Sequence, residues 1–182
     1  YIIFSDTVNN NLPVHQRKLG LKVRQSNLCS EIMLPTGVDH MGVDRTAVCC
    51  LSSLNAEKYL EWKDDEQFIE DVFRFLDNVL QDFIDRAPDE MERAKYSAFR
   101  ERSVGLGMMG YHSFLQKMNV PFESAMAQSW NKRMFQHIRQ AADKASVKLA
   151  DERGACPDAA EQGIKARFSH KLAIAPTASI SI

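Results

Sequence analysis

Hydrophobic positions three and four residues apart dominate the middle of the chain and predict one long helix there. Asp64 and Asp65 stand at its start, where acidic side chains interact favourably with the helix dipole. Arg86 lies at its end, and Pro88 predicts the stop because proline interrupts a helix interior. The apolar positions that share one face are Phe68, Ile69, Val72, Phe73, Leu76, Val79, Leu80 and Phe83. This stripe is typical of a helix packed against a core.

Further helices are predicted in the second half of the chain. A charged helix is expected over Asp89–Arg102, and another over Met108–Met118, before Pro121. The last and longest runs over about Ser124–Arg153, with its serine as N-cap and Gly154 at the position where glycine commonly ends a helix. The methionine and aromatic residues on these helices are interpreted as core.

Strands are predicted on both sides of the helical region. Val23–Leu34 is the clearest candidate, and Thr46–Leu51 is a second one, rich in small and β-branched residues. Tyr1–Lys22 is expected to form a short strand and a polar loop, and Leu172–Ala175 a final short strand. The order strand, strand, helices, strand favours an α/β domain in which strand ends present chemistry and helices pack outside.

Three chemically distinct side chains occupy alternate positions inside the predicted strand Val23–Leu34. Asn27, Cys29 and Glu31 supply an amide, a thiol and a carboxylate. Side chains at positions i, i+2 and i+4 of a strand share one face. A hydrogen-bonding group, a redox-capable sulfur and a general base on one face indicate the wall of an active site. The alternative is a surface strand with an ordinary cysteine, since a free cysteine usually behaves as a small apolar residue.

The net charge of −1 changes the picture by excluding broad electrostatic binding to nucleic acid or to a membrane surface. No apolar run approaches the roughly 20 residues that span a bilayer. The first residues lack the basic region of a signal peptide, and the chain does not begin with methionine. We therefore expect a cytoplasmic protein and a piece cut at both ends from a longer domain.

Four cysteines, without a C-x-x-C pair, argue against a zinc site or a disulfide scaffold. Cys49 and Cys50 are adjacent and would face opposite ways on a strand, so at most one can share a space with Cys29. Either both are buried apolar thiols or one is a redox thiol, and the spacing leaves this open. Cys156 follows a predicted helix end and is expected to be structural. The five histidines show no metal-ligand spacing, so we expect no metal site.

Two glycine-rich or hydroxyl-rich segments need a separate interpretation. Gly105–Gly110 matches G-x-G-x-x-G, but Phe99–Ser103 does not read as the buried strand that a dinucleotide fingerprint requires. Tight packing at a helix start is the better account. Ala175–Ser179 follows an apolar segment. If a helix begins there, its free N–H groups and the Thr177 and Ser179 hydroxyls would bind an anion; the alternative is a plain capped turn.

Taken together, these segments resemble the large, catalytic subunit of class I ribonucleotide reductase. Ser26–Ile32 resembles the motif S-N-L-C-x-E-I, and Ala47–Asn55 resembles the strand A-x-C-x-L-S-x-x-N. Arg102–Gly107 resembles R-x-x-G-x-G, which accounts for the dinucleotide-like spacing. Gly154–Pro157 and Ala175–Ser179 also match, in the right order. The resemblance covers essentially the whole chain.

The resemblance implies a fold and a reaction. The fold would be α/β, part of the ten-stranded α/β barrel of these thiyl-radical enzymes with long peripheral helices, and residues 1–182 would be a fragment of that single catalytic domain. The reaction would be reduction of ribonucleoside diphosphates to deoxyribonucleoside diphosphates, with oxidation of a cysteine pair. The fragment alone is expected to be inactive.

The resemblance also assigns roles. Cys29 would become the thiyl radical that takes the 3′ hydrogen of the ribose, Glu31 would be the general base on the 3′ hydroxyl, and Asn27 would hydrogen-bond the ribose. By alignment Cys49, rather than Cys50, would be one of the two reducing thiols. The residues expected to hold the diphosphate through backbone N–H groups are Thr177, Ala178, Ser179 and Ile180.

The implied partners lie outside this chain. A metal-containing small subunit would supply the radical, and thioredoxin or glutaredoxin the electrons. The full-length chain would form a homodimer and bind ATP and deoxynucleotide effectors on other regions, without direct binding to DNA or membranes. The second reducing cysteine would precede this chain, and the radical-relay tyrosines and a dithiol tail would follow it. The alternatives are a cobalamin-dependent reductase, which generates its radical in the same chain, and a non-enzymatic helical interaction domain with inert thiols.

Overall fold

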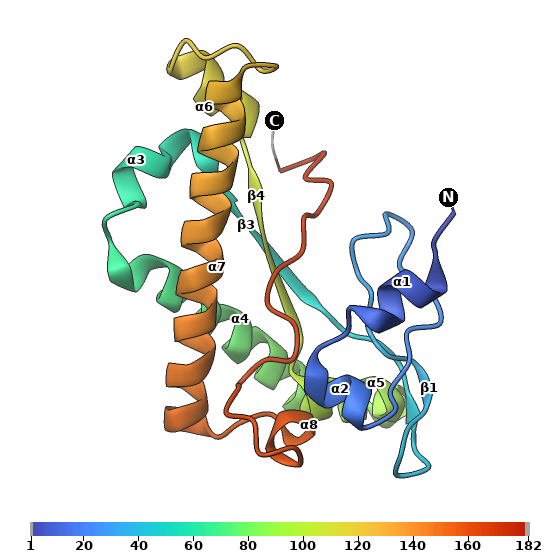
Figure 1. Cartoon of the computed structure of the whole chain (residues 1–182). Coiled ribbons are helices and arrows are strands. Elements are labelled where there is room, and N and C mark those ends of the chain that lie inside the picture. The colour runs from blue at the N-terminus through green and yellow to red at the C-terminus, as the bar shows by residue number, and fades with distance from the viewer. Residues whose placement is uncertain (1, 181–182) are drawn as a thin grey trace.

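The computed structural model describes residues 2–180, with helices surrounding one pair of parallel strands (Figure 1). The strands are β1 (Gly37–Val38), β2 (Asp44–Arg45), β3 (Cys50–Asn55) and β4 (Val104–Met109). The helices are α1 (Ser5–Asn10), α2 (Val14–Lys18), α3 (Tyr59–Trp62), α4 (Glu66–Arg86), α5 (Glu92–Glu101), α6 (Tyr111–Lys117), α7 (Ala125–Arg153) and α8 (Pro157–Ala160). Two 3₁₀ turns occupy Ala56–Lys58 and Asp89–Met91. The mixture of strands and helices agrees with the expected α/β class.

The parallel pair is the centre of the fold. Strand β3 pairs with β4 in a register that places Cys50 opposite Val104 and Asn55 opposite Met109. Helices α3, α4 and α5 connect the two strands, as parallel pairing requires. The C-terminal segment runs beside β4, where Leu106 forms an isolated parallel bridge with Leu172. In Figure 1 this segment follows β4 toward the C-terminus.

Helices α4 and α7 build most of the core and begin where the sequence predicts. The Asp65 carboxylate caps α4 by accepting from the N–H groups of Gln67 and Phe68, and Ser124 caps α7 by accepting from Ala127. These caps satisfy donors that no helical carbonyl can reach. The buried side chains that α4 and α7 share with the core include Ile69, Phe73, Leu76, Leu80, Met134, Ile138 and Leu149.

A buried carboxylate ties α4 to three other parts of the chain. Asp77 is completely buried and forms ion pairs with Arg102 at 2.7 Å, Arg167 at 3.0 Å and Arg153 at 2.7 Å. These arginines lie just before β4, after α8 and at the end of α7. The pairing holds the helical layer against the strands, and it lowers the pKa of Asp77 below its ordinary value against the opposing effect of burial.

Several predicted boundaries are wrong. The expected N-terminal strand is replaced by α1 and α2, in which the Asn9 amide donates to the Ser5 carbonyl and so supports a helical turn; Tyr1 lies outside the described residues. The second strand begins at Cys50 rather than Thr46, and the last one is reduced to the bridge at Leu172. The charged helix begins at Glu92, after a 3₁₀ turn, and the next begins at Tyr111 because the preceding residues belong to β4. Local composition does not specify which residues find a pairing partner.

Candidate active site

The segment that carries Asn27, Cys29 and Glu31 is a turn and not a strand. The Ser30 N–H donates to the Asn27 carbonyl at 3.1 Å, and the Ile32 N–H donates to Asn27 Oδ1 at 3.1 Å. Ser30 has a φ of 65°, in the left-handed region that reverses the chain. An asparagine side chain that captures a nearby backbone N–H competes with strand pairing. The prediction of a regular strand over Val23–Leu34 is therefore wrong, and alternation does not determine where these three side chains point.

The turn gives its three functional candidates different environments. Cys29 is exposed, on the turn itself. Glu31 is half-buried, and its Oε2 atom is buried with no hydrogen-bond partner among the described residues. A buried polar atom without a partner carries a free-energy penalty, so it marks a position where a ligand group is needed. Asn27 has its Oδ1 atom engaged by the backbone of Ile32.

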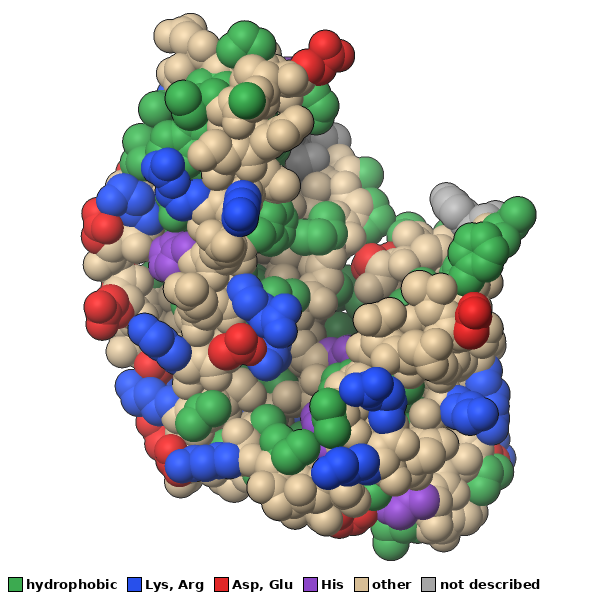
Figure 2. Space-filling view, in the orientation of Figure 1, with side chains coloured by type: hydrophobic (Ala, Val, Ile, Leu, Met, Phe, Trp, Pro, Cys, Tyr) green, Lys and Arg blue, Asp and Glu red, His purple; other side chains and the backbone are tan. Residues whose placement is uncertain are grey.

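A cavity of about 360 Å³ lies between this turn and the start of β3. Its lining residues are Gln25, Ser26, Asn27, Ile32, Leu34, Thr36, Thr46, Ala47, Cys49 and Leu51. The structure thus brings Asn27 and Cys49 to one wall, while Cys29 and Glu31 lie beside the cavity and outside this lining. A volume of this size is within the range of small-molecule sites. Figure 2 shows that this face of the molecule is hollowed between the region over α6 and the N-terminal helices.

The two adjacent cysteines face different surroundings. Cys49 lines the cavity, whereas Cys50, the first residue of β3, packs against the hydrophobic core. Burial, followed by the charges of Cys50, Glu101 and Glu31, raises the pKa of the Cys49 thiol to about 12. A thiol with such a pKa stays protonated at neutral pH, which suits the donation of a hydrogen atom more than nucleophilic attack.

The glycines of the G-x-G-x-x-G segment make room for this arrangement. Gly105 and Gly107 lie within β4, so the prediction that they mark a helix start is wrong. Gly110, the third glycine, does precede α6 and has a φ of 72°. A Cβ atom on Gly107 would come within 2.4 Å of the Ala173 carbonyl oxygen. The absent side chains let the C-terminal segment lie flat on β4.

The predicted diphosphate-binding residues follow that C-terminal segment. The Ala173 N–H donates to the Leu106 carbonyl at 3.2 Å, which fixes the segment just before the turn. Thr177 has a φ of 56°, and residues 178–180 form a turn whose side chains are exposed. A helix beyond this turn, which the anion-site hypothesis requires, would lie outside the described residues.

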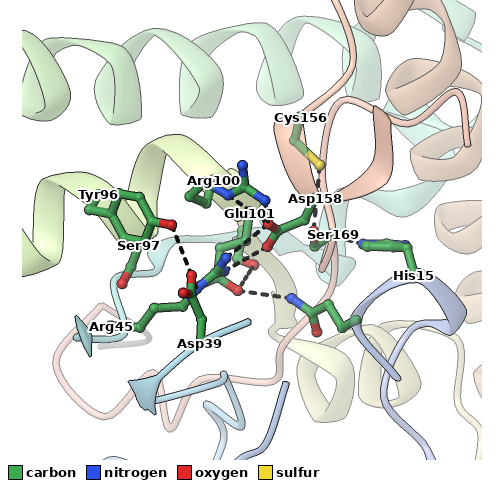
Figure 3. Close-up of polar contacts among 12 residues, drawn as sticks. His15, Asp39, Arg45, Tyr96, Ser97, Arg100, Glu101, Cys156, Asp158 and Ser169 are labelled. Carbon is green, nitrogen blue, oxygen red and sulfur yellow. Dashed lines mark hydrogen bonds and ion pairs between the residues drawn. The ribbon is translucent and has the colours of Figure 1, made fainter. Parts of the chain in front are cut away.

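A buried polar network behind the cavity was not anticipated from the sequence (Figure 3). Arg45 donates to Asp158 at 2.6 and 2.9 Å and to Asp39 at 2.9 Å, and Tyr96 donates to Asp39 at 2.9 Å. Arg100 also pairs with Asp158, at 2.8 Å. These contacts join the β1–β2 hairpin to α5 and α8.

Glu101 is part of the same region and has 0% exposure. It lies on the buried face of α5 with Ala94, Ser97 and Ala98, at helical spacing. A carboxylate at a position of an apolar helical stripe is the signal that could have identified it. Burial raises its pKa to about 8, against the lowering effect of Arg45.

The chain also matches a known protein family. The chain matches the family model "Ribonucleotide reductase, barrel domain" over residues 1–166. The chain therefore belongs to the ribonucleotide reductase barrel-domain family. Ribonucleoside-diphosphate reductase large subunits predominate among its relatives, which confirms the resemblance to the class I large subunit drawn from the motifs.

Two curated relatives and one solved structure define the similarity. The chain is 48% identical over its whole length to the ribonucleoside-diphosphate reductase large subunit of Invertebrate iridescent virus 3, and 45% identical to a putative large subunit of Frog virus 3. It covers 28% and 31% of those proteins. The solved "Actinobacillus ureae class Id ribonucleotide reductase alpha subunit" has a TM-score of 0.89 and 37% identity, with 98% of this chain and 33% of that one covered. The chain thus spans about a third or less of each relative.

Neither a candidate membrane-spanning helix nor a candidate metal-binding cluster is found among residues 2–180. Within residues 2–180, no helix combines the length and apolar character needed to cross a bilayer. Those residues also hold no group of three or more His, Cys, Asp or Glu side chains placed to bind a metal ion.

Proposed function

We propose that the full-length protein reduces ribonucleoside diphosphates to deoxyribonucleoside diphosphates, and that this chain supplies the thiol-bearing part of a ten-stranded catalytic barrel. One observation carries the proposal. Asn27 and Cys49, from two separate segments of the chain, line one cavity, and the Glu31 carboxyl group on the same turn as Asn27 has a buried oxygen with no hydrogen-bond partner among the described residues. The proposed reaction uses an amide, a protonated thiol and a carboxylate, which are the groups that these three side chains supply.

The turn residues would act at the 3′ position of the ribose. Cys29, exposed on the turn, would carry the thiyl radical and take the 3′ hydrogen atom. Glu31 would accept the proton of the 3′ hydroxyl, which would give its unpartnered oxygen a hydrogen-bond partner. Asn27 would hydrogen-bond the ribose through its amide nitrogen, because its oxygen is engaged by Ile32.

Cys49 would act at the 2′ position. The 2′ hydroxyl leaves as water, and two thiols supply two electrons and two hydrogens and become a disulfide. Cys49 is favoured over Cys50 because it lines the cavity while Cys50 packs against the core. Its partner would be a cysteine elsewhere in the full-length protein.

The diphosphate would be held by backbone N–H groups of residues Thr177 to Ile180. The support for this is the positive φ of Thr177 and the turn that follows, since turns of this kind expose successive N–H groups to an anion. The segment reaches this place because β4 carries glycines under it.

The remaining expectations concern the full-length protein in the cytoplasm. A small subunit with a metal centre would supply the radical when bound, and thioredoxin or glutaredoxin would reduce the disulfide. The large subunits would form a homodimer regulated by ATP and deoxynucleotides on other regions. These statements rest on family membership.

Substitution of the radical-bearing residue tests the proposal. In the full-length protein with its small subunit, Cys29→Ser should abolish nucleotide reduction, because a hydroxyl is a far poorer hydrogen-atom relay than a thiol. Glu31→Gln should slow it by about 10²–10⁴-fold, as loss of a general base does. Leu28→Ala changes a side chain that is 84% exposed on the same turn and should retain activity. Near-normal reduction by Cys29→Ser would overturn the proposal.

A cobalamin-dependent reductase is the second candidate, because relatives named vitamin B12-dependent reductases also match, at lower identity. The two candidates differ in what turnover requires. Activity that depends on a small subunit supports the first; activity restored by adenosylcobalamin alone supports the second. The inert helical interaction domain is disfavoured by membership of the family.

A further inference from the structure

Glu101 is a buried carboxyl group that the proposed reaction does not use. Its Oε2 atom accepts from Gln16 Nε2 at 3.0 Å and from Ser103 Oγ at 3.2 Å. Its Oε1 atom is buried with no hydrogen-bond partner among the described residues. A fully buried carboxyl oxygen without a partner is costly, so a functional explanation is required.

Strand register places this carboxyl group on the same side of the sheet as Cys49. Cys50 pairs with Val104, so Cys49 and Ser103 are the residues that directly precede the paired strands. Cys49 approaches the space above Gly105, and Ser103 lies two positions before Gly105, on the same face. Since Ser103 donates to Glu101, the carboxyl group lies next to a residue that shares this face of the strands with Cys49, which lines the cavity.

Among residues 2–180, Glu101 forms no ion pair of its own. The positive charge of Arg45 acts on Glu101, but Arg45 forms ion pairs with Asp39 and Asp158. The other titratable groups that interact with Glu101 are Asp158 on α8, Cys156 before α8 and Cys49 before β3. The Gln16 side chain, which donates to Glu101, also lies 2.8 Å from the neutral His170 ring. With its pKa at about 8, Glu101 holds a proton at neutral pH.

We propose that Glu101 delivers its proton to the Cys49 sulfur when a disulfide that contains Cys49 is reduced. In this role Glu101 is a positioning residue that acts through Cys49. The inference rests on the proposed redox role of Cys49. Its physical reason is that Cys49 is a poor leaving group as a bare thiolate, because its surroundings disfavour that negative charge. A neighbouring acid removes this obstacle.

The exchange balances as follows for an external dithiol. One thiolate of the reductant attacks the partner sulfur, the S–S bond breaks, and Cys49 leaves with the electron pair. The Glu101 proton moves to the Cys49 sulfur, and Glu101 recovers a proton from solvent. The second thiol of the reductant then displaces the partner cysteine, so the reductant ends as a disulfide and both protein cysteines as thiols.

The first test measures the coupling between Glu101 and Cys49 without turnover. In the full-length protein, alkylation of Cys49 by iodoacetamide is followed by peptide mass spectrometry from about pH 7 to pH 10. Glu101→Gln should make alkylation at the basic end roughly threefold faster, because it removes a negative charge that raises the pKa of the Cys49 thiol. Glu161→Gln, which removes a carboxylate bound to Arg100 and His40, should leave the profile unchanged. An unchanged profile in Glu101→Gln would overturn the inference.

The second test measures the proton delivery itself. The enzyme is oxidised by one turnover without reductant, and dithiothreitol then reduces the disulfide. After correction for the thiolate fraction of the reductant, the wild-type rate should fall above about pH 8, where Glu101 loses its proton. Glu101→Gln should be about 10²-fold slower at neutral pH and lack this fall. Glu101→Asp keeps an acid and should retain it.

The outcomes separate the two assignments. A flat wild-type profile, or wild-type rates in Glu101→Gln at every pH, would overturn the role of Glu101 while Cys49 keeps its redox function. Recovery of Cys49 as a free thiol after turnover would overturn both.

Discussion

The Cys49 sulfur lies 3.2 Å from the position that a Cβ atom on Gly105 would occupy. This Cβ atom on Gly105 would also come within 2.4 Å of the Leu51 side chain and 2.9 Å of the Ala173 side chain. The cavity wall, strand β4 and the C-terminal segment therefore meet at one point where no side chain fits. This contact explains why a glycine stands inside a buried strand, a position where glycine normally weakens a strand.

Gly105→Ala should consequently disturb both stability and the thiol. Overpacking at such a point typically costs about 1–3 kcal/mol of the free energy of unfolding, and urea unfolding of the full-length protein measures it. Gly107→Ala should also destabilise, because its Cβ would meet the Ala173 carbonyl oxygen, but it should leave Cys49 alkylation nearly unchanged. Equal alkylation rates in Gly105→Ala and wild type would show that the two strands move apart without displacing Cys49.

The adjacent thiols should differ in function. Cys49→Ser should block turnover supported by external dithiols, because the substrate-reducing pair is broken, whereas Cys50→Ser should keep most activity because Cys50 packs against the core. Peptide mapping after one turnover without reductant should find Cys49 in a disulfide. Recovery of Cys50 in that disulfide, with Cys49 free, would reverse the assignment.

Asp39 should make stability depend on acid pH. Although burial opposes it, hydrogen bonds from Arg45, Tyr96 and the backbone lower the pKa of Asp39 from 3.8 to about 2. The stabilisation, about 2 kcal/mol, is therefore present above the unfolded-state pKa and is lost as the pH falls toward 2. Urea unfolding should show a gap between wild type and Asp39→Asn that shrinks from about pH 5 downward. Asp82→Asn, at a side chain that is 58% exposed, should show little gap at any pH.

Asp77 should be among the most sensitive charged positions. Asp77→Asn leaves Arg102, Arg153 and Arg167 crowded without a compensating carboxylate. Loss of one member of a buried ion pair typically costs about 3–5 kcal/mol. Asp85→Asn, an exposed change on the same helix, is the matched control. A similar urea midpoint for both variants would show that the three arginines find other partners.

The long helices could be predicted because their signals are local. Asp65 and Ser124 cap α4 and α7 as their side chains suggest, and the apolar spacing of α4 identifies the buried face. The strands could not be placed to the residue, because Cys50 and Val104 become strand residues by pairing across a long connection. Sequence alone does not reveal such partners.

The geometry of the candidate site could not be predicted from the sequence. Asn27 was expected to share a strand face with Cys29, but its side chain instead closes a turn on the Ile32 backbone. Glu101 was overlooked because a charged residue near a helix end normally reads as solvated. The tertiary packing of α2, α5 and the strand ends shows that it is buried, as its position on the apolar stripe of α5 also indicates.

The contact of Ala173 with β4 also bears on how the protein is synthesised. The cavity wall comes from residues 25–51, which leave the ribosome before Ala173, whereas the surface beneath it requires Ala173 to lie on Gly105 and Gly107. Long-range contacts of this kind form after the intervening chain is available. During translation the thiols of this wall therefore emerge before Ala173 can complete the surface beneath them.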